Sequence, residues 1–458
     1  MSEVTGPTAG DFVDTIGLRA AFARSLSAMY GTEVPAYTTL VDVATEVNAQ
    51  VMAADAMAAQ RLGTIDRVSA ERHGAIRVGT PTELRQVAQV FAAFGMEPVG
   101  FYDLRGSAAT TLPIVSTAFR PIARDALAAN PFRVFTSVLV TDDRRYFDAE
   151  LQAELDDFLA SRELFGPELL DLAAKAESSG GLHSAEADRL LELATAVFEL
   201  SSEPVDRAWY ERLTTVSGVA ADIGGVRSTH INHLTPRVLD IDALYDRMTE
   251  RGISMIDEIQ GPPRWEGPDV LLRQTSFKAL AEPRRFREAD GSVVDGTLNV
   301  RFGEVEARGI ALTAKGRDLY DRMLIEVDER SEGLGPDEKH QVKVAVWREH
   351  LPTTEEELFD AGLGFCTVHR DASGALRREP IVYEDFLPRS AAGIFASNLS
   401  ESGSSDSAQQ GSVRDLAWLR EVIGRTVHDP TDLYAAEQVA SYEALGLDAP
   451  TLAGRAVP

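Results

Sequence analysis

The 458 residues are 44% hydrophobic and 26% charged, which is ordinary for a globular protein and allows two or three domains or one large elaborated domain. A formal net charge of −27 repels phosphate backbones and anionic lipid heads, so no nucleic-acid or membrane partner is expected, and a small acidic substrate must meet a local cluster of arginines. The single cysteine, Cys366, excludes an intramolecular disulfide, thiolate zinc sites and iron–sulfur clusters. The sequence shows neither a signal peptide nor an apolar run of membrane length, so a cytoplasmic protein is expected.

Helices are expected first and strands from residue 73 onward. Residues 12 to about 72 are expected to be helical, and the Ala-rich stretch 42–62 carries apolar side chains at three- and four-residue spacing. The short apolar stretch 74–78 is typical of a strand. Thr80-Pro-Thr-Glu83 then predicts a helix start, with a cap residue, proline at the first position and an acid in the first turn. Gly95 ends this helix, and a strand follows at 98–102.

The same order of elements recurs later in the chain. Residues 231–235 are strand-like, 241–248 have helical spacing that ends near Gly252, and 253–256 are again strand-like. Further strands at 132–140 and 298–311 complete the two copies. The repetition predicts an α+β protein with paired βαβββ modules that form a curved sheet around a metal site, with added helical segments.

Other segments interrupt or extend this repeat. Residues 151–213 are rich in Glu, Leu and Ala and predict helices, broken at 178–181, while Ser400–Ser412 is Ser/Gly-rich and typical of a mobile loop or linker. Residues 413–445 return to helix. The predicted parts are an N-terminal helical segment (1–72), a first module (73–140), a helical insertion (141–220), a second module with a substrate-pocket segment (221–400), and a loop with C-terminal helices (401–458).

His73 and Arg77 are the candidate functional residues of the first module. Residues i and i+4 of a strand face the same side, roughly 13 Å apart. A metal at His73 would then hold one end of a substrate while Arg77 binds a carboxylate at the other end. The alternative is a buried histidine bonded to the backbone, with Arg77 in an ordinary ion pair.

In the second module, His230 and His233 compete for the equivalent position. Pro236 disfavours a helix, and on a strand the two side chains point to opposite faces. His233 occupies the place that matches His73 in the repeat and is therefore preferred.

Glu304 and Glu306 alternate on a predicted strand and so share a face. Two buried carboxylates on one face are costly unless a cation compensates them, so a metal would satisfy one, and Arg308 or Arg301 the other. The alternative is a solvated strand face.

Two histidines and one carboxylate on rigid strands form a facial triad, which suits a non-haem Fe(II) oxygenase. No P-loop, zinc-protease helix, nucleophile elbow or dinucleotide fingerprint competes with this interpretation. The remaining histidines lie in polar surroundings and are expected at the surface: His183, His340, His350, His369 and His428.

The paired modules resemble the vicinal-oxygen-chelate architecture. Phe302-Gly-Glu304-Val-Glu-Ala-Arg308 resembles the glutamate-ligand segment of 4-hydroxyphenylpyruvate dioxygenase and hydroxymandelate synthase, and Ile231-Asn-His233 is similar to their first-histidine segment. This favours Glu304 over Glu306.

Four motifs together resemble the 2-oxoadipate dioxygenase/decarboxylase, or hydroxyglutarate synthase, family. They are His73-Gly-Ala-Ile-Arg77, His230-Ile-Asn-His233-Leu-Thr-Pro-Arg237, Arg301-Phe-Gly-Glu304 and Tyr383-Glu-Asp-Phe-Leu-Pro-Arg389-Ser390-Ala-Ala-Gly393-Ile-Phe395. The resemblance implies Fe(II) held by His73, His233 and Glu304, with Arg77 on the substrate carboxylate. It also implies a pocket segment from Leu387 to Gly393, which contains Arg389 and Ser390.

The implied reaction converts 2-oxoadipate and O2 to 2-hydroxyglutarate and CO2, as in lysine breakdown. Arg389 departs from the family motif, which has a small apolar residue there, so an extra guanidinium could grip a carboxylate, shorten the pocket or face solvent. Three alternatives remain: the same chemistry on another 2-oxo acid, an O2-independent isomerase or lyase with Zn²⁺ or Ni²⁺, and a binding protein without a redox metal.

Overall fold

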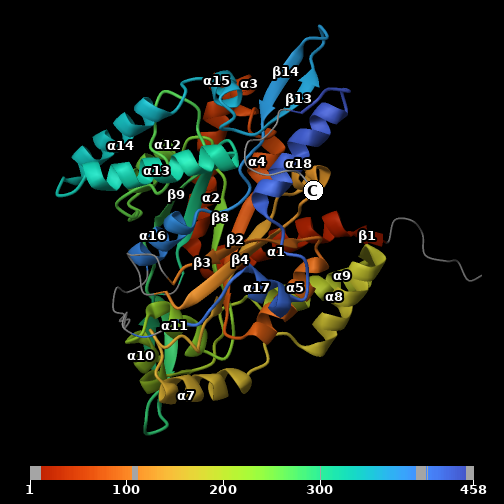
Figure 1. Ribbon diagram of the computed structural model, residues 1–458. Helices are drawn as coiled ribbons and strands as arrows, with labels where there is room; N and C mark the ends of the chain where they lie inside the picture. Colours follow the sequence, from red (N-terminus) through yellow and green to blue (C-terminus); the bar gives the residue numbers. More distant parts are fainter. Residues whose placement is uncertain (1–11, 106–111, 300, 399–408, 410, 450–458) are drawn as a thin grey trace, which may run out of the picture.

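The structure is a computed structural model that describes residues 12–105, 112–299, 301–398, 409 and 411–449 (Figure 1). Most of its strands lie near the centre, with helices around them. The Ser400–Ser412 stretch, predicted as a loop or linker, lies outside the described residues except for 409, 411 and 412.

The first βαβββ unit forms where the sequence predicts it. It consists of β2 (Arg72–Val78), α5 (Pro81–Ala92), β3 (Glu97–Asp103), β4 (Ile114–Arg120), α6 (Arg124–Ala129) and β5 (Arg133–Leu139). The strands are ordered β3-β4-β5-β2, with β5 parallel to β2. Thr80 Oγ1 accepts from Glu83 N at 3.1 Å, and the Glu83 carboxylate accepts from Thr80 N at 3.1 Å, so the predicted helix start is a complete capping box.

The second unit repeats this order with an insertion. It consists of β8 (Ile231–Pro236), α12 (Ile241–Glu250), β9 (Leu272–Phe277), β10 (Glu282–Arg287), β11 (Val293–Leu298) and β12 (Gly303–Arg308). β9 pairs antiparallel with β12, and the β10–β11 hairpin interrupts their connection. The strand expected at 253–256 is reduced to one bridge between Met255 and Phe277.

The two units meet along β2 and β8. These strands are antiparallel, with Ala75 opposite His233. β12 continues the arrangement beside β8, because Arg237 bridges to Glu306 in parallel and Val238 N donates to the Glu306 carbonyl at 2.8 Å. The predicted α+β class with paired βαβββ modules is therefore confirmed.

The N-terminal segment consists of helices, of which the first two pack against β8. They are α1 (Thr15–Glu33), α2 (Pro35–Ala54), α3 (Ala56–Ala59) and α4 (Ile65–Ala70), preceded by the short strand β1 (Phe12–Asp14). Phe22 of α1 stacks on Phe94 with ring centroids 4.4 Å apart. Arg19 is buried and donates to the carbonyls of Phe94, Ala126 and Asn130, so its charge is solvated by the backbone at the end of α5 and α6.

The predicted helical insertion is mostly helical. It contains α7 (Ala149–Ala160), α8 (Pro167–Ser179), β6 (Gly181–His183), α9 (Ser184–Ala196), β7 (Val205–Asp206), α10 (Arg207–Thr214) and α11 (Gly218–Gly224). Gly180, in the predicted break, ends α8 with φ 69°, a left-handed conformation that favours glycine. β6 pairs with β1, which ties the insertion to the N-terminus.

A further layer, which the sequence did not separate from the second module, follows β12. It comprises α13 (Ala314–Arg330), α14 (Pro336–His350), α15 (Glu355–Asp360), β13 (Cys366–Arg370) and β14 (Leu376–Pro380). The chain continues with α16 (Pro388–Asn398), and α17 (Leu416–Ile423) and α18 (Pro430–Glu443) lie in the part predicted as C-terminal helices. Figure 1 shows α13–α15 and the β13–β14 hairpin together at the top of the molecule. Trp347 and Tyr320 meet edge to face at 5.8 Å in the core of this layer.

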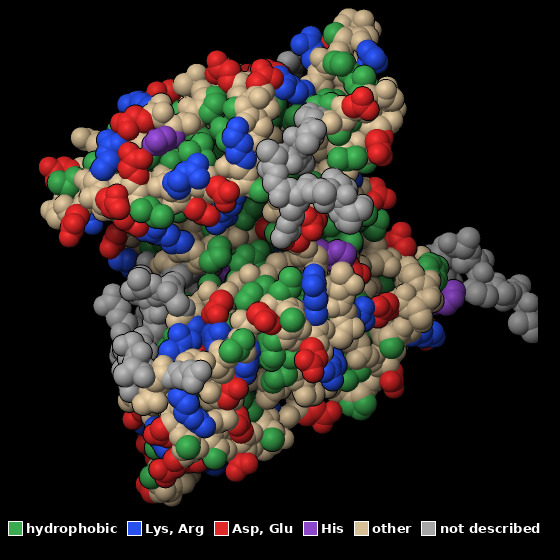
Figure 2. Space-filling view, viewed as in Figure 1, with side chains coloured by type: hydrophobic (Ala, Val, Ile, Leu, Met, Phe, Trp, Pro, Cys, Tyr) green, Lys and Arg blue, Asp and Glu red, His purple; other side chains and the backbone are tan. Residues whose placement is uncertain are grey.

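The visible surface carries both signs of charge. Figure 2 shows acidic side chains spread over this face among lysines and arginines rather than gathered in one patch. Within the described residues, no helix is both long and apolar enough to span a membrane.

Replacing Thr80 with alanine removes the side-chain cap of α5, and we expect the free energy of unfolding to fall by about 1 kcal/mol. Urea denaturation followed by circular dichroism measures this difference. Thr249→Ala is the matched control, because Thr249 is exposed in the last turn of α12 and donates only to the Tyr245 carbonyl. The control should change stability by less than about 0.5 kcal/mol. Equal losses in both variants would contradict the capping role.

Candidate metal centre

His73, His233 and Glu304 come together on three neighbouring strands. Each side chain is buried and offers one ligand atom, and these atoms lie within 4.8 Å of one another. His73 Nε2 lies 3.1 Å from Glu304 Oε2, and His233 Nε2 lies 3.4 Å from Glu304 Oε1. The pairing of β2 with β8, and the position of β12 beside β8, brings the three residues together across the junction of the two modules.

A hydrogen-bonded chain fixes the ring of His233. Its Nδ1 lies 3.0 Å from Thr235 Oγ1, and the Thr235 hydroxyl donates to Glu304 Oε2 at 3.5 Å. This chain places the ring proton on Nδ1 and leaves Nε2 as an acceptor. Burial, opposed by Glu304, lowers the pKa of His233 to about 4, so the imidazole is neutral and able to bind a cation at pH 7.

The Glu306 carboxylate contacts His73 on the ring nitrogen that does not face Glu304. His73 Nδ1 lies 2.9 Å from Glu306 Oε2, and the His73 ring meets Phe386 edge to face at 5.1 Å. Burial alone would lower the pKa of His73, but the charges of Glu306 and Glu304 outweigh burial and raise it. A metal ion at Nε2 would take the place of the proton that these carboxylates favour.

The two glutamates of β12 differ in how their charge is compensated. Arg308 donates to both Glu306 oxygens at 2.8 Å, and Arg133 lies 3.3 Å away. Burial would raise the pKa of Glu306, but Arg308 and the neighbouring charges hold it at about 2. Glu304, in contrast, pairs with no arginine or lysine among the described residues, and Gln274 Nε2 donates to it at 3.2 Å. A buried carboxylate without a cation is costly, and a bound metal would supply the missing charge.

Behind the triad lies a cluster that we call the buried charge network. It comprises four arginines and three glutamates: Arg67, Arg133, Arg237, Arg308, Glu71, Glu306 and Glu384. Glu71 is its centre, with Arg133 at 2.8 Å and Arg237 at 2.9 Å. These arginines hold the pKa of Glu71 well below its usual range in spite of burial. The network therefore fixes Glu306, and through it His73.

Arg77 lies four residues after His73 on β2 and is buried. Its guanidinium pairs with Asp222 of α11. Burial would raise the pKa of Asp222, but the neighbouring charges of His230 and Arg77 keep it below its usual value. Asn232 Nδ2 also donates to Asp222 at 3.1 Å. Asp222 is thus a charged carboxylate that orients Arg77.

The structure separates the two candidate histidines of β8. His233 meets Glu304, whereas His230 Nε2 lies 3.4 Å from Asp222. Burial lowers the pKa of His230 to about 4. His230 therefore belongs to the polar surroundings of Arg77. None of the five histidines expected at the surface is buried.

Within the expected pocket segment, Leu387 to Gly393, Ser390 and Arg389 differ in their exposure to solvent. Ser390 of α16 is buried, but the Arg389 side chain is 63% exposed and donates to Asp328 of α13 at 2.8 Å. The residues just before α16 approach the triad, since Phe386 packs against His73. Asp385, next to Phe386, fixes this segment, because its carboxylate accepts two hydrogen bonds from the buried Arg120 at 2.8 and 3.1 Å.

The donor set fits a divalent transition metal. Two imidazole nitrogens and one carboxylate on one side would leave the other coordination positions of a metal open, as in two-histidine-one-carboxylate iron centres. Gln274 supports the fit, because its buried Oε1 has no hydrogen-bond partner in the described structure although its Nε2 reaches Glu304. Fold and site together define a paired-module protein with a buried triad of candidate metal ligands.

The comparisons with known proteins identify the family. The sequence model of the family described as 2-oxoadipate dioxygenase/decarboxylase matches residues 22–398, and the chain belongs to this family. A 2-oxoadipate dioxygenase/decarboxylase of Mycobacterium tuberculosis is 55% identical over 92% of this chain and 96% of its own length. One from Pseudomonas putida is 39% identical over 95% and 97%. The crystal structure of the Pseudomonas putida hydroxyglutarate synthase in complex with 2-oxoadipate has a TM-score of 0.81 at 36% identity, and covers 95% of this chain and 98% of that one.

Several residues that shape the site were not predicted from the sequence. Asp222 and Gln274 lie in segments without a motif, and only the fold brings them to Arg77 and Glu304. Phe302, in contrast, has a sequence signal, because it stands two residues before Glu304, and its ring stacks on His233 at 5.3 Å.

Substitution of the two β8 histidines separates their roles. His233→Ala should weaken metal affinity at least about 100-fold, because a ligand is lost, whereas His230→Ala should bind one metal per chain. Anaerobic Fe(II) titration followed by metal analysis measures both. Loss of metal in His230→Ala with retention in His233→Ala would overturn the assignment.

Thr235→Val tests the chain that orients His233. Removing the hydroxyl without changing the shape should weaken metal affinity about tenfold. Thr275→Val on β9 is the matched control, since Thr275 is equally buried and its hydroxyl makes no hydrogen bond within the described residues. Competition with a metal chelator gives both affinities, and equal affinities would exclude a role for the hydroxyl.

Proposed function

We propose that this chain is a 2-oxoadipate dioxygenase/decarboxylase that converts 2-oxoadipate and O2 to 2-hydroxyglutarate and CO2. The metal is proposed to be Fe(II), bound by His73, His233 and Glu304. The observation that carries the proposal is the buried Glu304, which has two imidazole nitrogens beside it and no arginine or lysine paired with it among the described residues. Membership of the family supplies the substrate class.

Fe(II) held by His73, His233 and Glu304 would supply the redox chemistry of the reaction with O2. The protein contributes the position of the substrate. His73 and Arg77 lie four residues apart on one strand, a spacing of roughly 13 Å, so the 2-oxo acid end lies at the triad and Arg77 binds the distal carboxylate. Asp222 holds the Arg77 guanidinium in place for this contact. Phe302 and Phe386 pack against the ligand rings and limit access of water.

Ser390 is proposed to line the same pocket, because it is buried on α16 next to the segment that packs on His73. A substrate contact of Arg389 requires its exposed ion pair with Asp328 to open, which costs only about 0–1 kcal/mol. A cytoplasmic location is also proposed, since the single cysteine, Cys366, is a buried free thiol.

O2 uptake by anaerobically Fe(II)-loaded protein on addition of 2-oxoadipate tests the reaction. We expect one O2 consumed per substrate, and 2-hydroxyglutarate that carries both atoms of isotopically labelled O2. Uptake only with another 2-oxo acid would change the substrate and keep the chemistry. No uptake by iron-containing protein with any 2-oxo acid would reject the dioxygenase and favour a metal-dependent isomerase or lyase.

Arg77→Ala should raise the KM for 2-oxoadipate at least about 30-fold and uncouple O2 consumption from hydroxylation, because a charged hydrogen-bond partner of the distal carboxylate is lost. Arg348→Ala is the control of equal charge, since Arg348 lies at the surface and pairs only with Glu266. Unchanged KM and coupling in Arg77→Ala would contradict its assigned contact.

A further inference from the structure

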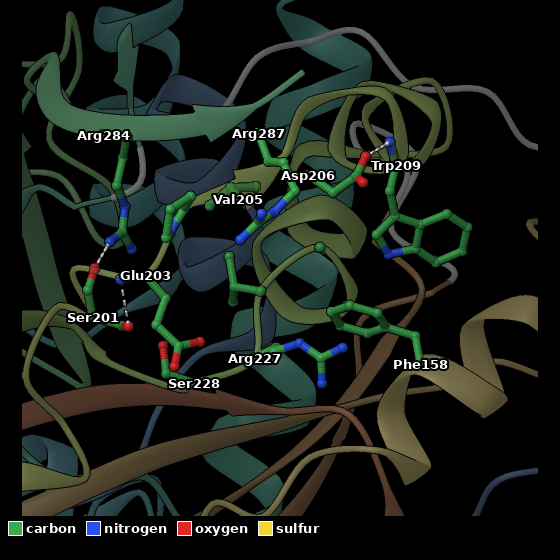
Figure 3. A pocket seen from close by; sticks show the side chains of 13 residues that line it. Phe158, Ser201, Glu203, Val205, Asp206, Trp209, Arg227, Ser228, Arg284 and Arg287 are labelled. Carbon is green, nitrogen blue, oxygen red and sulfur yellow. Dashed lines mark hydrogen bonds between the residues drawn. The ribbon is translucent and has the colours of Figure 1, made fainter. Parts of the chain in front are cut away.

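A cavity of about 610 Å³ lies outside the metal centre. It is lined by α7, by residues 201–209, by the loop 225–228 that precedes β8, and by β10. In Figure 3, Phe158 and Trp209 stand at one end of the cavity and Arg284 at the other, with Arg227 and Arg287 between them. Neither the three candidate metal ligands nor Arg77 lines it. Its volume is that of a small-molecule site.

The walls of the cavity carry more positive than negative charge, with three arginines against two acids. Arg284 and Arg287 lie on β10 and Arg227 lies in the loop before β8, and within the described part of the protein none of them forms an ion pair with a carboxylate. Two acids also line the cavity, Glu203 and Asp206. Asp206 is committed to capping α10, where it accepts from the Trp209 backbone N–H at 2.9 Å. An anion is therefore the ligand that these walls favour.

Among the arginines of the cavity, Arg284 gives the strongest indication of a bound anion. It is 6% exposed, and its buried Nε has no hydrogen-bond partner in the described structure, while Nη1 donates to the Ser201 carbonyl. Burial lowers the pKa of Arg284, and the attraction of Asp222 only partly opposes this effect. A buried guanidinium with an unsatisfied donor costs stability that a bound anion would recover.

We propose that this cavity binds a small organic carboxylate, with its carboxylate on the three arginines and its carbon chain against Phe158 and Trp209, and that its occupation weakens substrate binding at the metal centre. Guanidinium groups recognise carboxylates through paired hydrogen bonds, and the two aromatic rings, 6.0 Å apart, provide an apolar wall. Dicarboxylic acids of the size of the proposed substrate and product are the ligand class.

The sign of the coupling follows from charge, and this part rests on the proposed role of Arg77. Asp222 pairs with Arg77, and its charge also acts on Arg284. Arg284 and Arg77 are therefore close enough to the same carboxylate for charges at the two sites to interact. An anion on Arg284 adds a negative charge that repels the distal carboxylate of the substrate at Arg77. This repulsion opposes substrate binding, and reciprocity requires the substrate to weaken binding of the anion equally.

Titration calorimetry of the metal-free protein with glutarate, which has no 2-oxo group, tests the site directly. Arg77→Ala removes glutarate binding at the catalytic site, so binding in this variant reports the cavity. Adding Arg227→Gln and Arg287→Gln, both exposed, should weaken that binding at least tenfold. Adding Arg285→Gln is the matched control, because Arg285 is exposed on the same strand and is absent from the lining, and it should leave binding unchanged.

Absence of glutarate binding in Arg77→Ala, or binding that the two glutamine substitutions leave unchanged, would overturn the site. Binding of inorganic phosphate without binding of glutarate would overturn the carboxylate assignment. These outcomes do not depend on turnover, so they are independent of the proposed reaction. In O2 uptake with 2-oxoadipate, glutarate should raise KM more in the wild-type chain than in Arg227→Gln/Arg287→Gln, at unchanged kcat. Equal inhibition of both proteins would overturn the coupling.

Discussion

The arrangement of the metal centre depends on compensation of buried charge. The four arginines and three glutamates of the buried charge network come from α4 and the residue after it, from β5 and β12, from the residue after β8, and from the segment before α16. The network therefore joins both modules behind the triad. Removing one partner of a buried pair typically costs about 3–5 kcal/mol, because the other charge is left unpaired. Such a network tolerates few arrangements, and this restriction sets the positions of β2, β8 and β12 relative to one another.

Within this frame, two alternate residues of one strand have opposite roles. The Glu306 carboxylate pairs with Arg308, Arg133 and His73. Its negative charge is compensated by the two arginines, and it holds the imidazole ring of His73 in place. Glu304, two residues earlier, keeps a buried carboxylate whose neighbours are neutral groups or histidines. The surroundings favour a metal cation at Glu304 and disfavour one at Glu306, which already pairs with arginines, although the residue type and the strand face are the same. Charge compensation around the side chain, and not the side chain itself, makes the difference.

Local signals predicted much of this structure. Thr80 and Glu83 define the start of α5, and Gly95 ends it. The order of strand, helix and strand then predicts the first module, because capping and periodicity act within a few residues. The choice of Glu304 came only from the family resemblance. Asp222 and the α13–α15 layer were not foreseen, since Asp222 reaches Arg77 across 145 residues and such pairing leaves no trace in either segment.

The cavity outside the metal centre is built entirely from segments that interrupt the repeat of βαβββ modules. Its walls come from the helical insertion, from the loop that leads into β8, and from the hairpin placed between β9 and β12, whereas the triad stands on strands that the two modules share. The catalytic strands and the cavity walls can therefore change at different rates during evolution. A family with this construction can acquire, retune or lose a second ligand in the inserted segments while the inherited strands keep their chemistry.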